Sequence, residues 1–175
     1  MNKNKCGFSL LEIVLYLGVV SMSIILIFII FDQVRSYKKI KIENNNITTI
    51  KVGVKNLYNS SSSYTGLNTE SAIKANIIPS HMIDLKAKII KHSFNGNVEI
   101  IASSNLESFN STFKIIYSNV PTRECSKIIL NIGSGFLTVN INGFRIKEYN
   151  EKINKEEVIK ICNWRDLNEI VFVSE

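Results

Sequence analysis

The chain has 175 residues, of which 45% are hydrophobic and 21% charged, and a formal net charge of +6 at pH 7. This length suggests one compact domain and an anchor segment. The basic excess is concentrated in residues 32–59, with six basic and two acidic residues, whereas residues 60–175 carry 13 basic and 12 acidic residues. The excess therefore fits a solvated helix face attracted to lipid headgroups. It argues against a nucleic-acid-binding patch on the folded part.

An apolar run dominates the N-terminal part of the chain. It extends over 24 residues from Phe8 to Phe31, and Glu12 is its one formal charge. As a helix it is long enough to cross a hydrocarbon core of about 30 Å. The positive charges of Lys3 and Lys5 predict a cytoplasmic N-terminus, with the chain after Phe31 outside. A carboxylate in such a helix is costly, so Glu12 is a candidate functional residue.

The flanks of this run argue against a cleaved secretory signal peptide. Such a peptide has an apolar core of about 7–15 residues, followed by a cleavage site with small residues. Here the run is longer, and the polar segment 32–35 follows it. We therefore expect the apolar segment to remain in the mature protein. Hydropathy alone leaves an uncleaved signal anchor as an equal alternative.

Residues 32–59 are predicted to continue the same helix. Large apolar residues recur in this segment at spacings of 7, 3, 4 and 3, and polar residues fill the other faces: Ile40, Ile47, Ile50, Val54 and Leu57. Asn59 and the serines at 60–63 end the pattern. This half is amphipathic, so it should pack on a globular domain.

The remainder, residues 60–175, has the pattern of an α+β domain. We predict short helices over 69–76, 121–130 and 155–162. Alternating apolar and polar residues predict strands over 98–102, 112–118, 135–140, 144–147 and 169–173. Asn142-Gly143 indicates a hairpin, and Asn95-Gly96-Asn97 a turn. The fold class is therefore a long N-terminal helix packed on an antiparallel sheet of four to five strands, with short helices.

The three cysteines fall into two groups. Cys6 lies ahead of the apolar run, whereas Cys125 and Cys162 lie in the part expected outside the membrane. Disulfides persist in such compartments, so we predict a bond between Cys125 and Cys162. Two cysteines cannot complete a structural zinc site, and the two histidines show no ligand-like spacing with them. We expect neither a metal nor a cofactor.

The sequence does not indicate an enzyme. His81 and His92 have no paired nucleophile, and both are expected at the surface or in turns. The segment Gly133-Ser134-Gly135 lacks the Gly-x-Ser-x-Gly pattern of a nucleophile elbow. Trp164 is expected to pack near Cys162, and an exposed adhesive role at a surface is the alternative.

The N-terminus resembles that of type IV pilins and the related pseudopilins. The resemblance rests on Lys3-x-Lys5-Cys6-Gly7-Phe8-Ser9-Leu10-Leu11-Glu12 and the apolar helix behind it. It implies cleavage between Gly7 and Phe8 by a membrane peptidase and N-methylation of Phe8. It also implies that Glu12 pairs with the N-terminus of a neighbouring subunit during assembly, which offsets the desolvation of its carboxylate.

The rest of the chain resembles type IVb pilins. The matching positions are Tyr64-x-Gly66-Leu67-x-Thr69, Ile77-Ile78-Pro79-Ser80-x-Met82-Ile83, Phe94-x-Gly96-x-Val98, Phe113-x-Ile115-x-Tyr117, Val120-Pro121, Cys125, and Cys162 before Ile170-x-Phe172. In that family the disulfide bounds an exposed C-terminal region. Phe8 and the short leader depart from this subclass and match the type IVa pattern.

The resemblance implies a four-part organisation: a cleaved leader (1–7), a membrane and fibre-core helix (8–31), an amphipathic continuation (32–59) and a globular head (60–175). The implied function is a pilus subunit that is held in the inner membrane and then assembled into a cell-surface fibre for adhesion, aggregation, motility or DNA uptake. Its implied partners are other pilin subunits, the prepilin peptidase and methylase, the assembly platform and, before assembly, the lipid bilayer. Nucleic-acid binding is left open but is not indicated by the charge distribution.

Two alternatives stay open. Within the same class, the chain could be a minor pilin or a secretion-type pseudopilin. In a different class, it could be an uncleaved, membrane-anchored extracytoplasmic binding module, which predicts a retained leader and no special role for Glu12.

Overall fold

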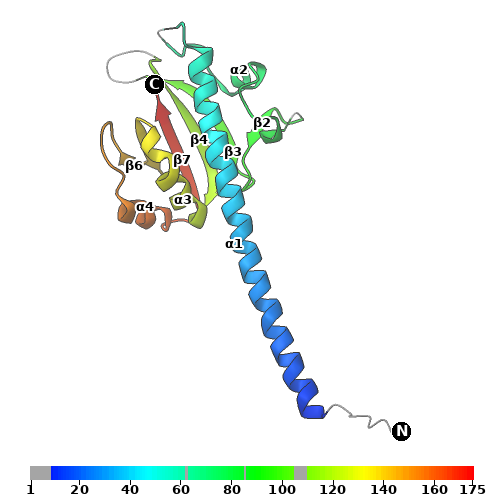
Figure 1. Cartoon of the computed structure of the whole chain (residues 1–175). Coiled ribbons are helices and arrows are strands. Elements are labelled where there is room, and N and C mark those ends of the chain that lie inside the picture. The colour runs from blue at the N-terminus through cyan, green and yellow to red at the C-terminus, as the bar shows by residue number, and fades with distance from the viewer. Residues whose placement is uncertain (1–8, 62, 85, 105–109) are drawn as a thin grey trace. The chain divides into compact units, whose positions relative to one another are not determined.

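A computed structural model describes residues 9–61, 63–84, 86–104 and 110–175 of the chain (Figure 1). The chain consists of two compact units, Met1–Lys38 and Lys39–Glu175. Helix α1 (Leu10–Leu57) begins in the first unit and ends in the second. The predicted long helix is therefore confirmed for the described residues, although it ends at Leu57, two residues before the predicted end at Asn59.

In the first unit, α1 presents apolar side chains to the outside. Nearly every described side chain of residues 10–31 is exposed, with Leu10 82% and Phe28 67% exposed. The helix is long and apolar enough to cross a membrane. Exposing such a surface to water costs about 25 cal/mol per Å². This half of the helix therefore requires lipid or other apolar helices around it.

In the second unit, the inner face of α1 forms part of the core. Ile40, Ile47, Ile50 and Val54 are buried, as the helical spacing predicts, whereas Leu57 is 49% exposed. The expectation for Leu57 was wrong. Leu57 lies only about 20° around the helix from the buried Ile50, so its exposure follows from its place as the last residue of α1.

Among the described residues, the sheet of the second unit has seven strands in the order β1-β2-β3-β4-β7-β5-β6, and all neighbouring pairs are antiparallel. The five predicted strands are present as β3 (Asn97–Ser103), β4 (Thr112–Pro121), β5 (Thr138–Ile141), β6 (Phe144–Lys147) and β7 (Leu167–Ser174). The predicted number was too small by two, because β1 (Ile83–Asp84) and β2 (Ile89–Lys91) were missed. Strands of two and three residues are too short to show alternation.

The predicted short helices are all present. They are α2 (Thr69–Lys74), α3 (Thr122–Ile132) and α4 (Lys155–Cys162). Two 3₁₀ turns, η1 (Ser80–Met82) and η2 (Gly133–Gly135), were not predicted. Turn η2 occupies the start of the strand expected over 135–140, so that strand begins later, at Thr138.

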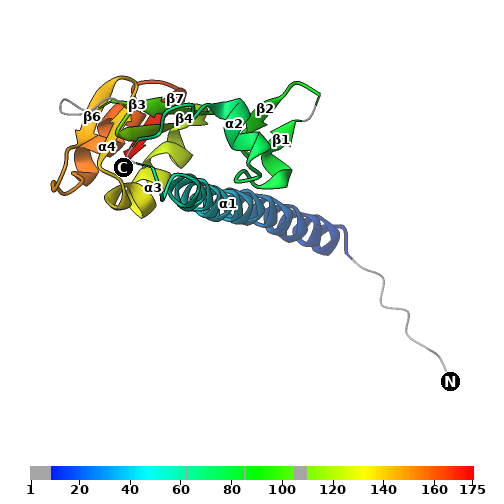
Figure 2. The same cartoon turned by 90° about the horizontal axis from the view of Figure 1, so that it is seen from above.

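The core lies on one face of the sheet. Along β3, Val98 and Ile100 are buried while Glu99 and Ile101 are exposed, and the same alternation continues in β4 and β7. The second half of α1 and helix α3 cover this buried face (Figure 2). Strand β7 lies between β4 and β5, so the C-terminal strand joins the two parts of the sheet.

Candidate functional site

Glu12 lies in the first turn of α1. The backbone N–H of Ser9 donates to its Oε2 at 2.9 Å. This contact satisfies one of the free N–H groups at the helix start, where a negative charge is also favourable. Within the described part of the chain, no basic group forms an ion pair with Glu12. The predicted cleavage and methylation residues, Gly7 and Phe8, lie outside the described residues.

The apolar half of α1 satisfies its own polar groups. The hydroxyls of Ser21 and Ser23 donate to the carbonyls of Gly18 and Val19, both at 2.9 Å. Near the end of the apolar run, the guanidinium of Arg35 lies 4.1 Å from the centroid of the Phe31 ring. The surface of this half of the helix is therefore compatible with an apolar environment as far as the basic segment that begins at Arg35.

A second carboxylate, Glu43, is fully buried where α1 meets the sheet. Its Oε1 accepts from the backbone N–H of Ser93 at 2.8 Å and from the Ser93 hydroxyl. Its Oε2 accepts from the hydroxyl of Tyr117 at 3.2 Å and from Nδ2 of Asn46 at 3.2 Å. Four donors match a carboxylate, which can only accept. We call Glu43, Asn46, Ser93 and Tyr117 the buried carboxylate site.

His92 forms one wall of this site. Its ring stacks on Tyr117 with 5.2 Å between centroids, and its Nε2 lies 2.8 Å from the carbonyl of Ser118. The backbone N–H of Phe94 donates to Nδ1 at 3.2 Å, so the network assigns a neutral ring with the proton on Nε2. Gly96 permits this approach, because a Cβ there would collide with the Ser118 carbonyl and the His92 ring.

Burial shifts the pKa of both rings. Desolvation lowers the pKa of His92, and the Ser118 carbonyl and Glu43 oppose that shift. Desolvation also raises the pKa of Tyr117 well above its usual value, and the charge of Glu43 adds to this effect. At neutral pH the histidine is therefore neutral and the tyrosine keeps the proton that it donates to Glu43.

The sequence analysis missed this site. Glu43 was counted only among the charges of residues 32–59, and His92 was expected at the surface or in a turn. Both side chains are buried. His92 does begin a turn, since its carbonyl accepts from the N–H of Asn95 at 3.0 Å. The spacing of seven residues between Ile40 and Ile47 could have indicated that an intervening residue also faces the core. One helical turn after Ile40 the stripe continues at position 43, where a glutamate stands.

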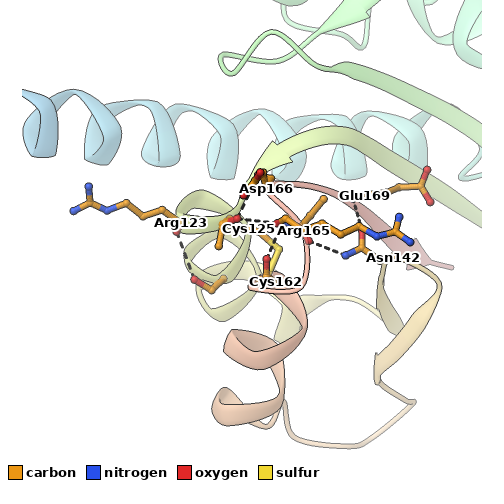
Figure 3. The surroundings of a disulfide bond; sticks show 10 residues. Arg123, Cys125, Asn142, Cys162, Arg165, Asp166 and Glu169 are labelled. Carbon is orange, nitrogen blue, oxygen red and sulfur yellow. Dashed lines mark hydrogen bonds between the residues drawn. A yellow bond between two sulfur atoms is a disulfide. The ribbon is translucent and has the colours of Figure 1, made fainter.

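The predicted disulfide is confirmed. Cys125 of α3 and Cys162 at the end of α4 are bonded, with their Cα atoms 6.0 Å apart (Figure 3). Asn168 supports the end of α4, since its Nδ2 donates to the carbonyls of Cys162 and Arg165 at 3.0 and 3.1 Å. Asn142 donates to Asn168 Oδ1 at 2.7 Å, which ties the β5–β6 turn to the same point. The bond closes a region that contains β5, β6 and α4.

Trp164 was expected to be packed, and it is 55% exposed. Its ring meets Phe144 edge-on, with centroids 5.0 Å apart and an interplanar angle of 90°. Phe144 is itself 48% exposed. Helix α4 ends at Cys162, two residues earlier, so the turn that follows points Trp164 away from the core.

Metal ligation is not suggested by the described residues. They contain no group of three or more His, Cys, Asp or Glu residues that could hold a metal ion.

A family model and solved structures match this chain. The family described as PilS N terminal matches residues 37–175. TcpA, a type IV pilin from Vibrio cholerae El Tor biotype, is 11% identical, with a TM-score of 0.62 and coverage of 79% of this chain and 99% of TcpA. A type IVb pilin from Salmonella typhi is 19% identical, with a TM-score of 0.58 and coverage of 75% and 97%. No curated protein gives a significant match.

The two structural neighbours share the fold over 79% and 75% of this chain, and the family match covers the whole second unit, which includes the disulfide. The resemblance to type IVb pilins is thereby confirmed. The chain belongs to the PilS N terminal family and has the type IV pilin fold in its IVb-like form.

Proposed function

We propose that this chain is a structural subunit of a type IV pilus. The carrying observation is the first half of α1, which exposes apolar side chains on every face although the second unit has a complete core of its own. Pilins of this fold assemble into polymers through head-to-tail contacts between subunits. Contacts of this kind that do not close into a ring produce open filaments. In this proposal the apolar half resides in the inner membrane before assembly and among identical helices afterwards.

In this proposal, Glu12 fixes the position of each subunit relative to its neighbour in the fibre. In an apolar helix bundle an unpaired carboxylate costs several kcal/mol. Inside its own chain Glu12 has the N–H of Ser9 as a partner. The positively charged N-terminus of a neighbouring subunit would supply the missing charge. This pairing requires cleavage between Gly7 and Phe8 by the prepilin peptidase, and extraction by the assembly platform then delivers the subunit to the fibre.

A pair of matched substitutions in the producing strain tests the proposal. Glu12→Gln removes the charge and keeps the shape, whereas Asp32→Asn does the same to an exposed carboxylate beyond the apolar run. We expect Glu12→Gln to reduce the subunit in sheared fibres by at least about tenfold, since one pairing of this kind is worth 1.4 kcal/mol or more. The amount in the membrane should not change.

Asp32→Asn should leave fibre incorporation within twofold of the wild type, because its carboxylate lies outside the apolar segment. Equal incorporation of the Glu12→Gln and Asp32→Asn chains would contradict the proposal. It would favour the uncleaved, membrane-anchored binding module, for which Glu12 has no special role.

A further inference from the structure

A lysine-rich groove lies on the second unit, apart from the apolar helix and from the buried carboxylate site. It has a volume of about 560 Å³ and is bordered by α1, by the segment from Ser134 to Leu137 and by the loop between β6 and α4. Ligand pockets typically measure about 300–1,000 Å³, so the groove is large enough for a small molecule. We call it the lysine groove.

Positive charge is concentrated in this groove. Five lysines line it, against two glutamates, Glu151 and Glu175: Lys51, Lys55, Lys147, Lys152 and Lys155. Among the residues that the structure describes, none of these lysines forms an ion pair with a carboxylate. Lys51 and Lys55 come from the basic segment 32–59, and the other three lysines come from the nearly neutral head, so the groove combines positive charge from both parts of the chain.

Two of the lysines are held by backbone carbonyls. Lys51 donates to the carbonyl of Gly135, and its ammonium lies 4.8 Å from the centroid of the Phe136 ring. Lys147 is only 7% exposed and donates to the carbonyls of Phe136 and Leu137. Both ammonium groups are therefore fixed over one short segment of chain. A buried cation that has only neutral acceptors is a costly arrangement unless a further partner offsets it.

The lysines also oppose one another electrostatically. Burial lowers the pKa of Lys51, and the charges of Lys55 and Lys147 lower it further. An anion in the groove would offset this repulsion and would accept charge-assisted hydrogen bonds from the ammonium groups. An ammonium group has three donors around a point charge, which suits a compact tetrahedral oxyanion.

From these observations we infer that the lysine groove is a binding site for a small soluble molecule bearing phosphate groups. Lys51, Lys55 and Lys147 contact its oxyanion oxygens, and the apolar side chains of Phe136 and Ile153 line the remaining wall. The inference does not depend on assembly into a pilus, because all of these residues belong to the second unit.

Calorimetric titration of the full chain in detergent micelles with inorganic pyrophosphate tests this site. At low ionic strength we expect a single site with a dissociation constant on the order of 1 mM or tighter. Lys51→Gln with Lys55→Gln should weaken binding by at least about tenfold, because two charge-assisted donors are lost. Glutamine is a good helix former, so α1 should be preserved in this variant.

A control variant has the same change of net charge, but at two lysines outside the groove. Lys127→Gln with Lys160→Gln removes two exposed lysines, on α3 and α4, that do not line the groove. Binding by this control should stay within twofold of the wild type. Absence of pyrophosphate binding at about 10 mM, or equal weakening in both double variants, would overturn the inference. Circular dichroism confirms that each variant is folded.

Discussion

At the scale of single residues, the carboxylate of Glu43 joins three elements. It accepts from the turn between β2 and β3 through Ser93 and from β4 through Tyr117, while its own backbone belongs to α1. The position of the second half of α1 on the sheet is therefore set by polar contacts as well as by its isoleucines. Such a buried polar network gives specific alignment only when every member is satisfied.

Glu43→Ala tests this role. The substitution leaves four donors without their acceptor: the Ser93 N–H, the Ser93 hydroxyl, the Tyr117 hydroxyl and Nδ2 of Asn46. Each unsatisfied buried group costs about 1–3 kcal/mol, so we expect unfolding free energy to fall by about 3 kcal/mol or more. Glu99→Ala, at an exposed position on β3, should change it by less than about 0.5 kcal/mol. Urea unfolding measures both, and equal effects would contradict the assignment.

His92 makes the stability of the head depend on pH. Burial lowers the pKa of His92 in the folded protein. The unfolded chain therefore binds more protons as pH falls through about 6.5, and stability declines toward acid over that range. The groups facing the ring are Glu43, Tyr117, the Ser118 carbonyl and the backbone N–H of Phe94.

A histidine pair separates this effect from general acid sensitivity. We expect His92→Gln to reduce the loss of stability between pH 7.5 and pH 5.5, measured by urea unfolding midpoints. His81→Gln changes an exposed histidine and should leave the pH dependence as in the wild type. An unchanged pH dependence in His92→Gln would show that the ring does not titrate in this way.

The buried residues show the limit of reasoning from residue type. Glutamate and histidine are mostly exposed or intermediate in proteins, so a sequence argument places them outside the core. What overrides this tendency is a set of partners from distant segments, Ser93 and Tyr117, which no local pattern identifies. For Cys125 and Cys162 the prediction and the structure agree, since the two residues form the expected disulfide.

At the scale of elements, α1 and the segment around Ile77 lie unusually close together. A Cβ added at Gly53 would stand 2.9 Å from the Cβ of Ile77 and 3.2 Å from its Cγ2. A glycine in a helix interior costs up to about 1 kcal/mol relative to alanine. The close approach of the two segments explains why a glycine occupies this position. A methyl group at this position must displace the neighbouring chain.

Gly53→Ala should therefore destabilise the second unit despite the better helix propensity of alanine. Overpacking of this kind costs about 1–3 kcal/mol. Gly18→Ala is the matched control in the same helix, where an added Cβ meets nothing within 4 Å. Gly18→Ala should therefore not lower the free energy of unfolding, and the helix propensity of alanine would raise it by at most about 1 kcal/mol. A stabilised Gly53→Ala chain would show that Ile77 moves aside without cost.

The long, periodic elements were predictable from the sequence, and the short ones were not. Helix α1 has 48 residues and β4 has 10, so their periods of 3.6 and 2 repeat several times. Strand β2 depends on pairing with β3 across the turn at Asn95-Gly96, and β1 depends on pairing with β2, not on their own composition. Of turn η2, only Gly135 was expected in a strand, because a three-residue turn with two glycines carries no periodic pattern that marks where the strand begins.

At the scale of the whole molecule, one helix combines two environments. Its first part is apolar on every face and carries Glu12, and its second part contributes a buried stripe to a folded unit closed by a disulfide. Such a division is expected of a subunit that is held in a membrane and later joins a fibre. The same division would also serve a permanently anchored protein, so processing at the N-terminus decides between the two.

The most direct measurement is the intact mass of the protein from native membranes, with and without reductant, together with the sequence of its N-terminal peptide. The account predicts a chain that begins at N-methylated Phe8 and gains two hydrogens on reduction, from the Cys125–Cys162 bond. A chain that still begins at Met1 would contradict the proposed function and leave an anchored binding module as the better description.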